Sequence, residues 1–517
     1  MRQHPDPRKA FVYHEPRLLA YEVRAPFSPG EAYPEYPFDD PGSSGENEVY
    51  QAVRKCLFLM GLDAGRFGTP QWNPLGDFIE PGQRVLIKPN FVLDFHGFGW
   101  SLESVITHGS IIRAVLDYVL LALKGQGVVR IGDAPLQSAD FGKICQLSGL
   151  NAVLDFYRGR SALVVDVADF RQECALLNER RWIREKGAVA GDPEGYATVD
   201  LKAESMFYPV AAQFARYRVT NYDPKLMSLH HNERKNEYLV SRSILKADAV
   251  ISLPKIKTHR KAGITACLKN SIGINGHKDW LPHHRRGGVS RGGDEYLYAN
   301  PFKAIADSLM ERADLEYSPV KVRFLRGCQA IASRLGKVAT PDKYFEGGWY
   351  GNDTLWRTVI DLNRILRYAN CQGKMQDRVQ RKCLFLADGI IAGEGEGPLE
   401  PTAKPCGLLV GGLSAPVLDA VIARLMGFDF KKIPSIREAF VVPSYPLLDF
   451  GPEQIEIVSN SIQLKGISIF EPGFSLNFVP ARGWQGRVEL RSPNAQLPSY
   501  PKPVNNLMLT YRGQRLP

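Results

Sequence analysis

Residues 247–259 read ADAVISLPKIKTH, an apolar run that ends in polar side chains. The run Ala249–Leu253 is typical of a buried strand, and Lys255, Lys257 and His259 follow at its carboxyl end. A similar order recurs at residues 81–92, 128–135, 161–170 and 382–389. Stretches with helical spacing separate several of these runs, for example near 108–124 and after Ser414. The alternation predicts an α/β fold with a mainly parallel sheet and helices on both of its faces.

The chain is long enough for more than one compact unit. With 517 residues we expect two lobes, and a β-containing cap inserted at about 171–235, where mixed charge interrupts the pattern. The predicted divisions are an N-terminal arm (1–44), an α/β body (45–480) and a basic C-terminal tail (481–517). The oligomeric state does not follow from these features.

Composition narrows the classes of protein and partner. The net charge of +10 suits an anionic ligand or surface. The eight cysteines are scattered without a CxxC pair, which argues against a zinc ribbon, a self-contained iron–sulfur cluster and a disulfide framework. The longest apolar stretches carry charges at helical spacing, and no secretory leader stands at the start. We therefore expect a cytoplasmic protein without a transmembrane span, and the absence of any nucleic-acid-binding signature argues against a nucleic-acid partner.

The polar residues after the strands predict a ligand site, because parallel sheets bind ligands outside the carboxyl ends of their strands. The lysines that follow these strands cannot all be buried unless anions or carboxylates compensate their charge. The alternative is a solvated basic loop, which the alternation of the lysines with Pro254, Ile256 and Thr258 disfavours. We expect an anionic substrate to be bound by Lys88, Asn90, Lys255, Lys269 and Asn270. The expected catalytic residues are His259, which would move a proton, and Lys257, Asp133 and Asp388.

A divalent cation is expected at the segment DGIIAGEGEGP, residues 388–398. Asp388 follows a buried strand, and Glu394 and Glu396 stand between glycines that permit a sharp turn. Such hard oxygen ligands suit Mg or Mn bridging to a phosphate. The alternative is a glycine-rich turn with solvated glutamates. The segment matches neither a GxGxxG dinucleotide fingerprint nor a phosphate-binding loop that ends in GK[ST].

A basic amphipathic helix is expected in VKVRFLRGCQAIASRLGKVATP, residues 320–341. It could lie on an anionic membrane as a peripheral contact, or it could cover the core. We favour the core, because surface helices outnumber membrane-bound ones in soluble chains.

Several motifs in the same order give the chain a family resemblance. They are VLIKPNFV, IGDAP, SLPKIKTH, TACLKNSIG, DGIIAGEGEGP, GLSAPVLDAVIARLMGFDFKKI and EPGF with ARGW. From about Asn47 to about Trp484 the chain resembles the family called domain of unknown function 362. Some members carry ferredoxin-like cysteine clusters. This chain lacks them, so no iron–sulfur cluster is expected.

Two further resemblances bear on function. DTLWRTVIDLNRIL, residues 353–366, is similar to a subgroup often met near surface-polysaccharide genes. The strand-end lysines and histidine with a KN-x-x-G turn resemble lactate-racemase-like proteins, which hold a nickel pincer nucleotide. The leading hypothesis is an enzyme that acts on an anionic small molecule or glycan precursor, phosphorylated or carboxylated. The alternatives are a non-catalytic binding or assembly protein of a polysaccharide pathway and a lactate-racemase-like isomerase. The reaction type stays open.

Overall fold

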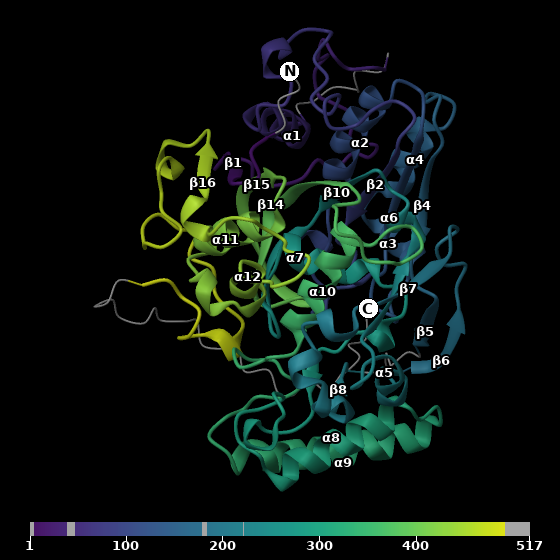
Figure 1. Cartoon of the computed structure of the whole chain (residues 1–517), viewed down its shortest axis with the longest axis vertical. Coiled ribbons are helices and arrows are strands. Elements are labelled where there is room, and N and C mark those ends of the chain that lie inside the picture. The colour runs from purple at the N-terminus through teal and green to yellow at the C-terminus, as the bar shows by residue number, and fades with distance from the viewer. Residues whose placement is uncertain (1–4, 39–46, 178–182, 221, 492–517) are drawn as a thin grey trace.

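One large sheet forms the centre of the molecule (Figure 1). The computed structural model describes residues 5–38, 47–177, 183–220 and 222–491. The main path of the sheet runs β16-β1-β15-β14-β10-β2-β3-β4, and β11 joins it through β14 and pairs with β12. Its strands are β1 (Lys9–His14), β2 (Arg84–Pro89), β3 (Val128–Asp133), β4 (Val165–Asp169), β10 (Ala249–Leu253), β11 (Lys255–His259), β12 (Gly263–Thr265), β14 (Lys382–Glu396), β15 (Glu400–Gly412) and β16 (Glu456–Ser459).

Helices cover both faces of this sheet. Alternate residues of β14 are buried in two different apolar cores, one on each face. Leu384 and Leu386 belong to an apolar core with α1 and α2, whereas Phe385 and Ala387 belong to a second core with α10, α11 and α12. Successive residues of a strand point to opposite faces, so one strand serves both cores. The helices are α1 (Glu48–Leu59), α2 (Gly109–Leu123), α3 (Phe141–Leu147), α4 (Leu150–Tyr157), α5 (Pro224–His230), α6 (Arg242–Leu245), α7 (Cys267–Asn270), α8 (Pro301–Asp314), α9 (Pro319–Val338), α10 (Leu355–Tyr368), α11 (Ala415–Met426) and α12 (Pro434–Ala439). The predicted α/β fold is confirmed.

The centre of the sheet is parallel and one side is antiparallel. The pairs β14/β10, β10/β2, β2/β3 and β3/β4 are parallel. By contrast, β15 runs antiparallel to both β14 and β1. The carboxyl ends of β2, β3, β10 and β14 therefore meet at one edge, which is where the polar residues that follow them gather.

The N-terminal segment is part of the sheet, which the sequence analysis did not foresee. β1 is inserted between β15 and β16. The cap region holds small separate sheets, in which β5 (Glu173–Leu177) pairs with β6 (Ile183–Ala188) and β7 (Tyr196–Asp200) pairs with β9 (Glu237–Ser241). A third pairs β8 (Tyr217–Arg218) with β13 (His284–Arg285). Most of the predicted tail lies outside the described residues, and the division into arm, body and tail stays a prediction.

The basic amphipathic helix does not cover the core, so that interpretation is wrong. In α9 the buried residues are Val322, Ala332 and Gly336. The helix packs along α8, and none of its residues belongs to the apolar cores around the sheet. Across the described residues, no helix combines the length and the apolar character that a bilayer crossing requires.

A buried pair of carboxyl groups lies where α8 meets the body. Asp307 of α8 is hydrogen-bonded to Glu295, and the Tyr296 hydroxyl donates to Asp307 at 3.2 Å. Burial raises the pKa of Asp307 to about 7, against the lowering effect of Arg286. A pair of this kind keeps a proton at neutral pH.

Because the folded state binds this proton more tightly than the unfolded chain, the proton stabilises the fold at low pH, and its contribution declines as the pH rises from about 4 towards 7. Asp307→Asn needs no proton at this position. We therefore expect the free energy of unfolding of this variant to fall by roughly 1–3 kcal/mol less than that of the wild type over this pH range. The free energy of unfolding from urea titrations at pH 5 and pH 7.5 measures it. Equal pH dependence in the two proteins would contradict the shared proton.

Candidate active site

The first feature of the candidate site is an ion pair between the ends of β2 and β3. Lys88 Nζ donates to Asp133 Oδ1 at 2.8 Å, and both side chains are 2% exposed. The same carboxylate accepts the backbone N–H groups of Phe91 at 2.6 Å and Ala134 at 2.9 Å. Asp133 is therefore occupied by internal donors and acts as a local counter-charge.

A second ion pair joins β11 and β14. Lys255 Nζ donates to Asp388 Oδ2 at 2.9 Å, and neither side chain is exposed. The hydroxyl of Tyr21 donates to Asp388 Oδ1 at 2.5 Å and accepts from Lys255 at 2.5 Å. The ring of Tyr21 stacks on His108 with 4.2 Å between centroids. Sequence reasoning missed Tyr21, because nothing in the local pattern of the N-terminal segment points to a partner more than two hundred residues away.

Two asparagines connect the first ion pair to the helix α7. Asn270 Oδ1 accepts from Lys88 Nζ and from Asn90 Nδ2, each at 3.2 Å. The Oδ1 of Asn90 is buried and has no hydrogen-bond partner among the described residues. Gly273 lies so close that a Cβ placed there would be 1.7 Å from Asp133 Oδ1. The backbone after α7 thus closes over the Lys88–Asp133 pair, and only glycine fits at this position.

Beyond these pairs, four further lysines lie in the segment from β11 to residue 278. Among the residues that the structure describes, none forms an ion pair with Lys257, Lys261, Lys269 or Lys278. Lys257 is fully buried and its Nζ donates to the carbonyl of Val105. Lys278 is 7% exposed and donates to the carbonyl of Ile272 at 3.2 Å. Lys269 is half-buried, and its ammonium group has no hydrogen-bond partner in the described part of the chain.

The lysines repel one another, and Lys269 lies at the centre of this repulsion. Burial lowers the pKa of Lys269 to about 8, helped by the charges of Lys261 and Lys88. Burial lowers the pKa of Lys278 to about 7, although Asp133 opposes the shift. The pKa of Lys257 falls well below its usual range because of burial and then Lys269. A ligand with negative charge would relieve this repulsion.

The histidines of the site are neutral. Burial lowers the pKa of His259 well below its usual value, and Lys269 adds to the shift. His259 Nδ1 accepts the backbone N–H groups of Lys261 at 3.0 Å and Ala262 at 3.1 Å. The proton of the neutral ring therefore sits on Nε2, so His259 offers a hydrogen-bond donor. The predicted role of His259 in moving a proton stays a prediction, and in this arrangement the ring would act as the donor.

A buried carboxylate holds the helix that carries Lys269. Asp419 of α11 accepts the N–H groups of Cys267 at 2.7 Å and Leu268 at 3.1 Å. These groups belong to the first turn of α7, where the N–H groups lack helical partners. The position of Lys269 and Asn270 is thus fixed from the far side by α11.

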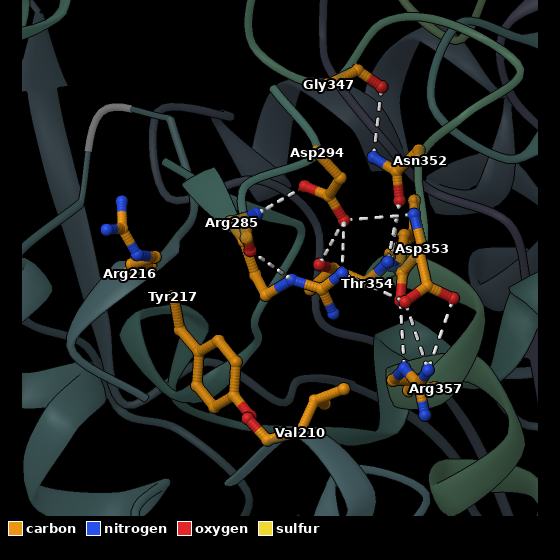
Figure 2. Close-up of polar contacts among 12 residues, drawn as sticks. Val210, Arg216, Tyr217, Arg285, Asp294, Gly347, Asn352, Asp353, Thr354 and Arg357 are labelled. Carbon is orange, nitrogen blue, oxygen red and sulfur yellow. Dashed lines mark hydrogen bonds and ion pairs between the residues drawn. The ribbon is translucent and has the colours of Figure 1, made fainter. Parts of the chain in front are cut away.

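A polar network joins Arg285, which follows His283 and His284 in the chain, to the residues just before α10 (Figure 2). Asp294 accepts from the backbone of Arg285 at 2.5 Å, from the Thr354 hydroxyl at 2.5 Å and from the backbone of Asp353 at 2.9 Å. Asn352 donates to the carbonyl of His283 at 2.9 Å. The DTLWR motif thus has a structural role beside the site: it fixes the loop that carries the two histidines.

The three predicted metal ligands do not form a common site. Asp388 is occupied by Lys255 and Tyr21. Glu394 and Glu396 lie in the extended strand β14 rather than in a turn. Glu394 pairs with Lys404 at 3.0 Å and accepts the N–H of Val479, and Glu396 accepts the N–H of Arg482. The long pairing of β14 with β15 is what carries the two glutamates away from the strand-end site.

A different set of side chains that could hold a metal ion lies beside β5. In the described part of the chain, the one group with ligand atoms within 4.8 Å of one another is Glu173, His277 and Asp279. Lys186 approaches both carboxylates at 3.6 Å and so balances their charge. Sequence reasoning missed this group because its members come from β5 and from the loop after Gly276.

The structure thus brings together Lys88, Asn90, Asp133, Lys257, His259, Lys269 and Asn270, which are linked by hydrogen bonds or by the electrostatic effects described above. Lys255 and Asp388 form the adjacent pair, and Lys255 acts electrostatically on Lys257. Lys261, Lys278 and His283 belong to the same group, and no role at the site was assigned to them from the sequence. Lys278 follows the TACLKNSIG run by only a few residues, and this short distance in the sequence could have indicated that it belongs to the site.

Comparison with known proteins places part of the chain in a family. A family model described as Domain of unknown function (DUF362) matches residues 180–424. No curated protein matches the chain. A crystal structure of a protein from Thermotoga maritima, a target of the Northeast Structural Genomics Consortium, is similar at a TM-score of 0.30 and 9% identity, and the match covers 70% of this chain and 56% of that protein. Residues 180–424 contain the Lys255–His259 strand, helix α7 and β14, and this part of the chain matches the model of the domain of unknown function 362 family.

Proposed function

We propose that the protein is an enzyme that acts on an anionic small molecule, phosphorylated or carboxylated, at the carboxyl ends of β2, β3 and β11. The observation that carries this proposal is the set of four lysines around Lys269 for which the described residues provide no carboxylate partner. Cations that are buried and repel one another destabilise a fold unless an anion offsets them. Folds retain such an arrangement where a ligand supplies the missing charge.

The proposed roles follow from accessibility and protonation. Lys269 and Lys261 bind the anion as ammonium groups, and His259 donates a hydrogen bond from Nε2. Lys278, whose pKa is about 7, is suited to take and return a proton at neutral pH. The pair Lys88–Asp133 and Asn270 hold the surrounding loop rather than the ligand.

Anion binding is tested directly with Lys269→Met, which keeps the aliphatic length of the side chain and removes its charge. A charge-assisted hydrogen bond contributes about 1.5–3 kcal/mol, so we expect affinity for the best anion to fall roughly 10- to 100-fold. Isothermal titration calorimetry with inorganic pyrophosphate and malonate measures this, the two probes standing for the phosphorylated and carboxylated classes.

The matched control is Lys465→Met, which changes the net charge equally at an exposed lysine. It should bind as the wild type does. Catalysis is tested by incubating wild type and Lys278→Met with a mixture of phosphorylated and carboxylated metabolites and analysing it by mass spectrometry. Consumption of one component by the wild type alone supports an enzyme. Failure of the wild type to bind either probe, or equal binding by Lys269→Met, would overturn the anion site.

A further inference from the structure

The helices α8 and α9 form a hairpin along one end of the molecule, at the lower edge of Figure 1. α9 faces α8 through Val322, Ala332 and Gly336, its buried residues. At Gly336 the helices approach closely, since a Cβ there would be 2.9 Å from Lys303 Cγ. The remainder of the α9 surface is therefore turned away from its partner helix.

That surface carries a stripe of large apolar side chains, the α9 stripe. Its residues and exposed fractions are Val320 (79%), Phe324 (70%), Ile331 (61%), Leu335 (45%) and Val338 (88%). With 3.6 residues per turn, their positions fall within about 60° of the helix circumference. Large exposed apolar side chains aligned on one side of a helix are typical of an interaction surface rather than of scattered exposed residues.

The charges on α9 have a single sign. The helix contains Lys321, Arg323, Arg326, Arg334 and Lys337, and it contains no acidic residue. Arg326 pairs with Asp314 of α8 and Lys321 pairs with Glu316 at 3.5 Å. Lys321, Arg323, Arg334 and Lys337 lie at exposed positions beside the stripe. An apolar stripe flanked by lysine and arginine complements the headgroup region of a membrane that contains anionic lipids.

The hairpin is firmly joined to the body. Glu311 of α8 accepts from Arg218 at 2.5 Å and from Arg286 at 3.2 Å. Lys303 of α8 is fully buried and pairs with Asp342. A surface bound by α9 would thus be held in a fixed relation to the loop of residues 284–296, which the Asp294 network also fixes.

We infer that the α8–α9 hairpin docks the protein on an anionic membrane surface, with the α9 stripe inserted at the headgroup level and the flanking lysines and arginines against lipid phosphates. The apolar side chains supply the burial and the cations supply selectivity for anionic lipid. This inference stands apart from the anion site. A protein can dock in this way whether or not that site is catalytic.

The test is cosedimentation of the full chain with vesicles of phosphatidylcholine alone and of phosphatidylcholine with 30% phosphatidylserine. We expect binding to the anionic vesicles to exceed binding to the neutral ones. Phe324→Glu/Ile331→Glu should reduce the bound fraction at least tenfold, because it places charges in the middle of the stripe. Both residues are exposed, so the substitutions remove no core contact.

Val441→Glu/Ile462→Glu is the matched control, because it adds the same two charges at residues that are 67% and 77% exposed and lie away from the hairpin in sequence. It should bind as the wild type does. Circular dichroism and size-exclusion chromatography with light scattering check the fold and the oligomeric state of each protein. The inference is overturned if the wild type does not bind anionic vesicles, or if the double variant binds equally well. A dimer that the double variant loses, without vesicle binding by the wild type, would assign the stripe to a second copy of the chain instead.

Discussion

Replacing Asp388 by alanine should destabilise the fold by about 3–5 kcal/mol, because it leaves a buried ammonium group without its partner. Lys255 and Asp388 have no exposed side-chain surface, and the carboxylate also accepts the Tyr21 hydroxyl. When the carboxylate is removed, the remaining ammonium group stays buried and gains no contact with water. Urea unfolding of wild type and Asp388→Ala, followed by circular dichroism, measures the change.

The control for this prediction removes the whole polar cluster. The triple variant Tyr21→Phe/Lys255→Met/Asp388→Leu leaves no buried charge or hydroxyl unpaired, so part of the lost stability should return. The return is incomplete because the backbone N–H groups of His108, Ile390 and Ile391 lose their acceptors. Glu456→Gln tests an exposed pair, that of Lys9 with Glu456 at 3.1 Å, and should cost less than about 1 kcal/mol. If Asp388→Ala and Glu456→Gln had equal effects, the interpretation of a buried, mutually dependent cluster would be wrong.

The position of the site could be predicted from the sequence because it depends on a local rule. Lys88, Asp133, Lys255 and Asp388 each follow a buried run, and parallel strands bring such positions to one edge. The rule says nothing about which side chains neutralise each other. Lys88 and Lys255 were assigned to the substrate, but carboxylates from neighbouring strands already hold them.

Features that depend on distant pairing could not be predicted. Tyr21 follows β1 in the chain and contacts Lys255 and Asp388, and β1 is held in the sheet by its pairing with β15 and β16. Glu394 and Glu396 looked like a flexible turn because of their glycines, but pairing with β15 extends this segment as a strand. For α9 the prediction of an amphipathic helix was correct, but the prediction that it covers the core was wrong. An amphipathic pattern gives a helix an apolar face without indicating what covers that face.

The affinity for an anion at the Lys269 site should fall as the pH rises from 6 to 9, and this is the most direct consequence of the lysine cluster. The pKa values are about 8 for Lys269, about 8 for Lys261 and about 7 for Lys278. Each lysine is charged below its pKa and neutral above it, so the positive charge that attracts the ligand is lost across this range. Ordinary exposed lysines, with a pKa near 10.4, would keep their charge up to pH 9.

Sulfate is the appropriate probe for this measurement, because its own charge does not change between pH 6 and 9. If a charge-assisted hydrogen bond contributes about 1.5–3 kcal/mol, the loss of two such bonds lowers the affinity by roughly 100-fold or more. Calorimetry at pH 6, 7.5 and 9 gives the slope, and Lys269→Met should make it shallower as well as weaken binding. A wild-type affinity that stays level over this range would mean that the lysines keep their protons. The absence of carboxylate partners around Lys269 would then reflect exposure to water rather than a site prepared for an anion.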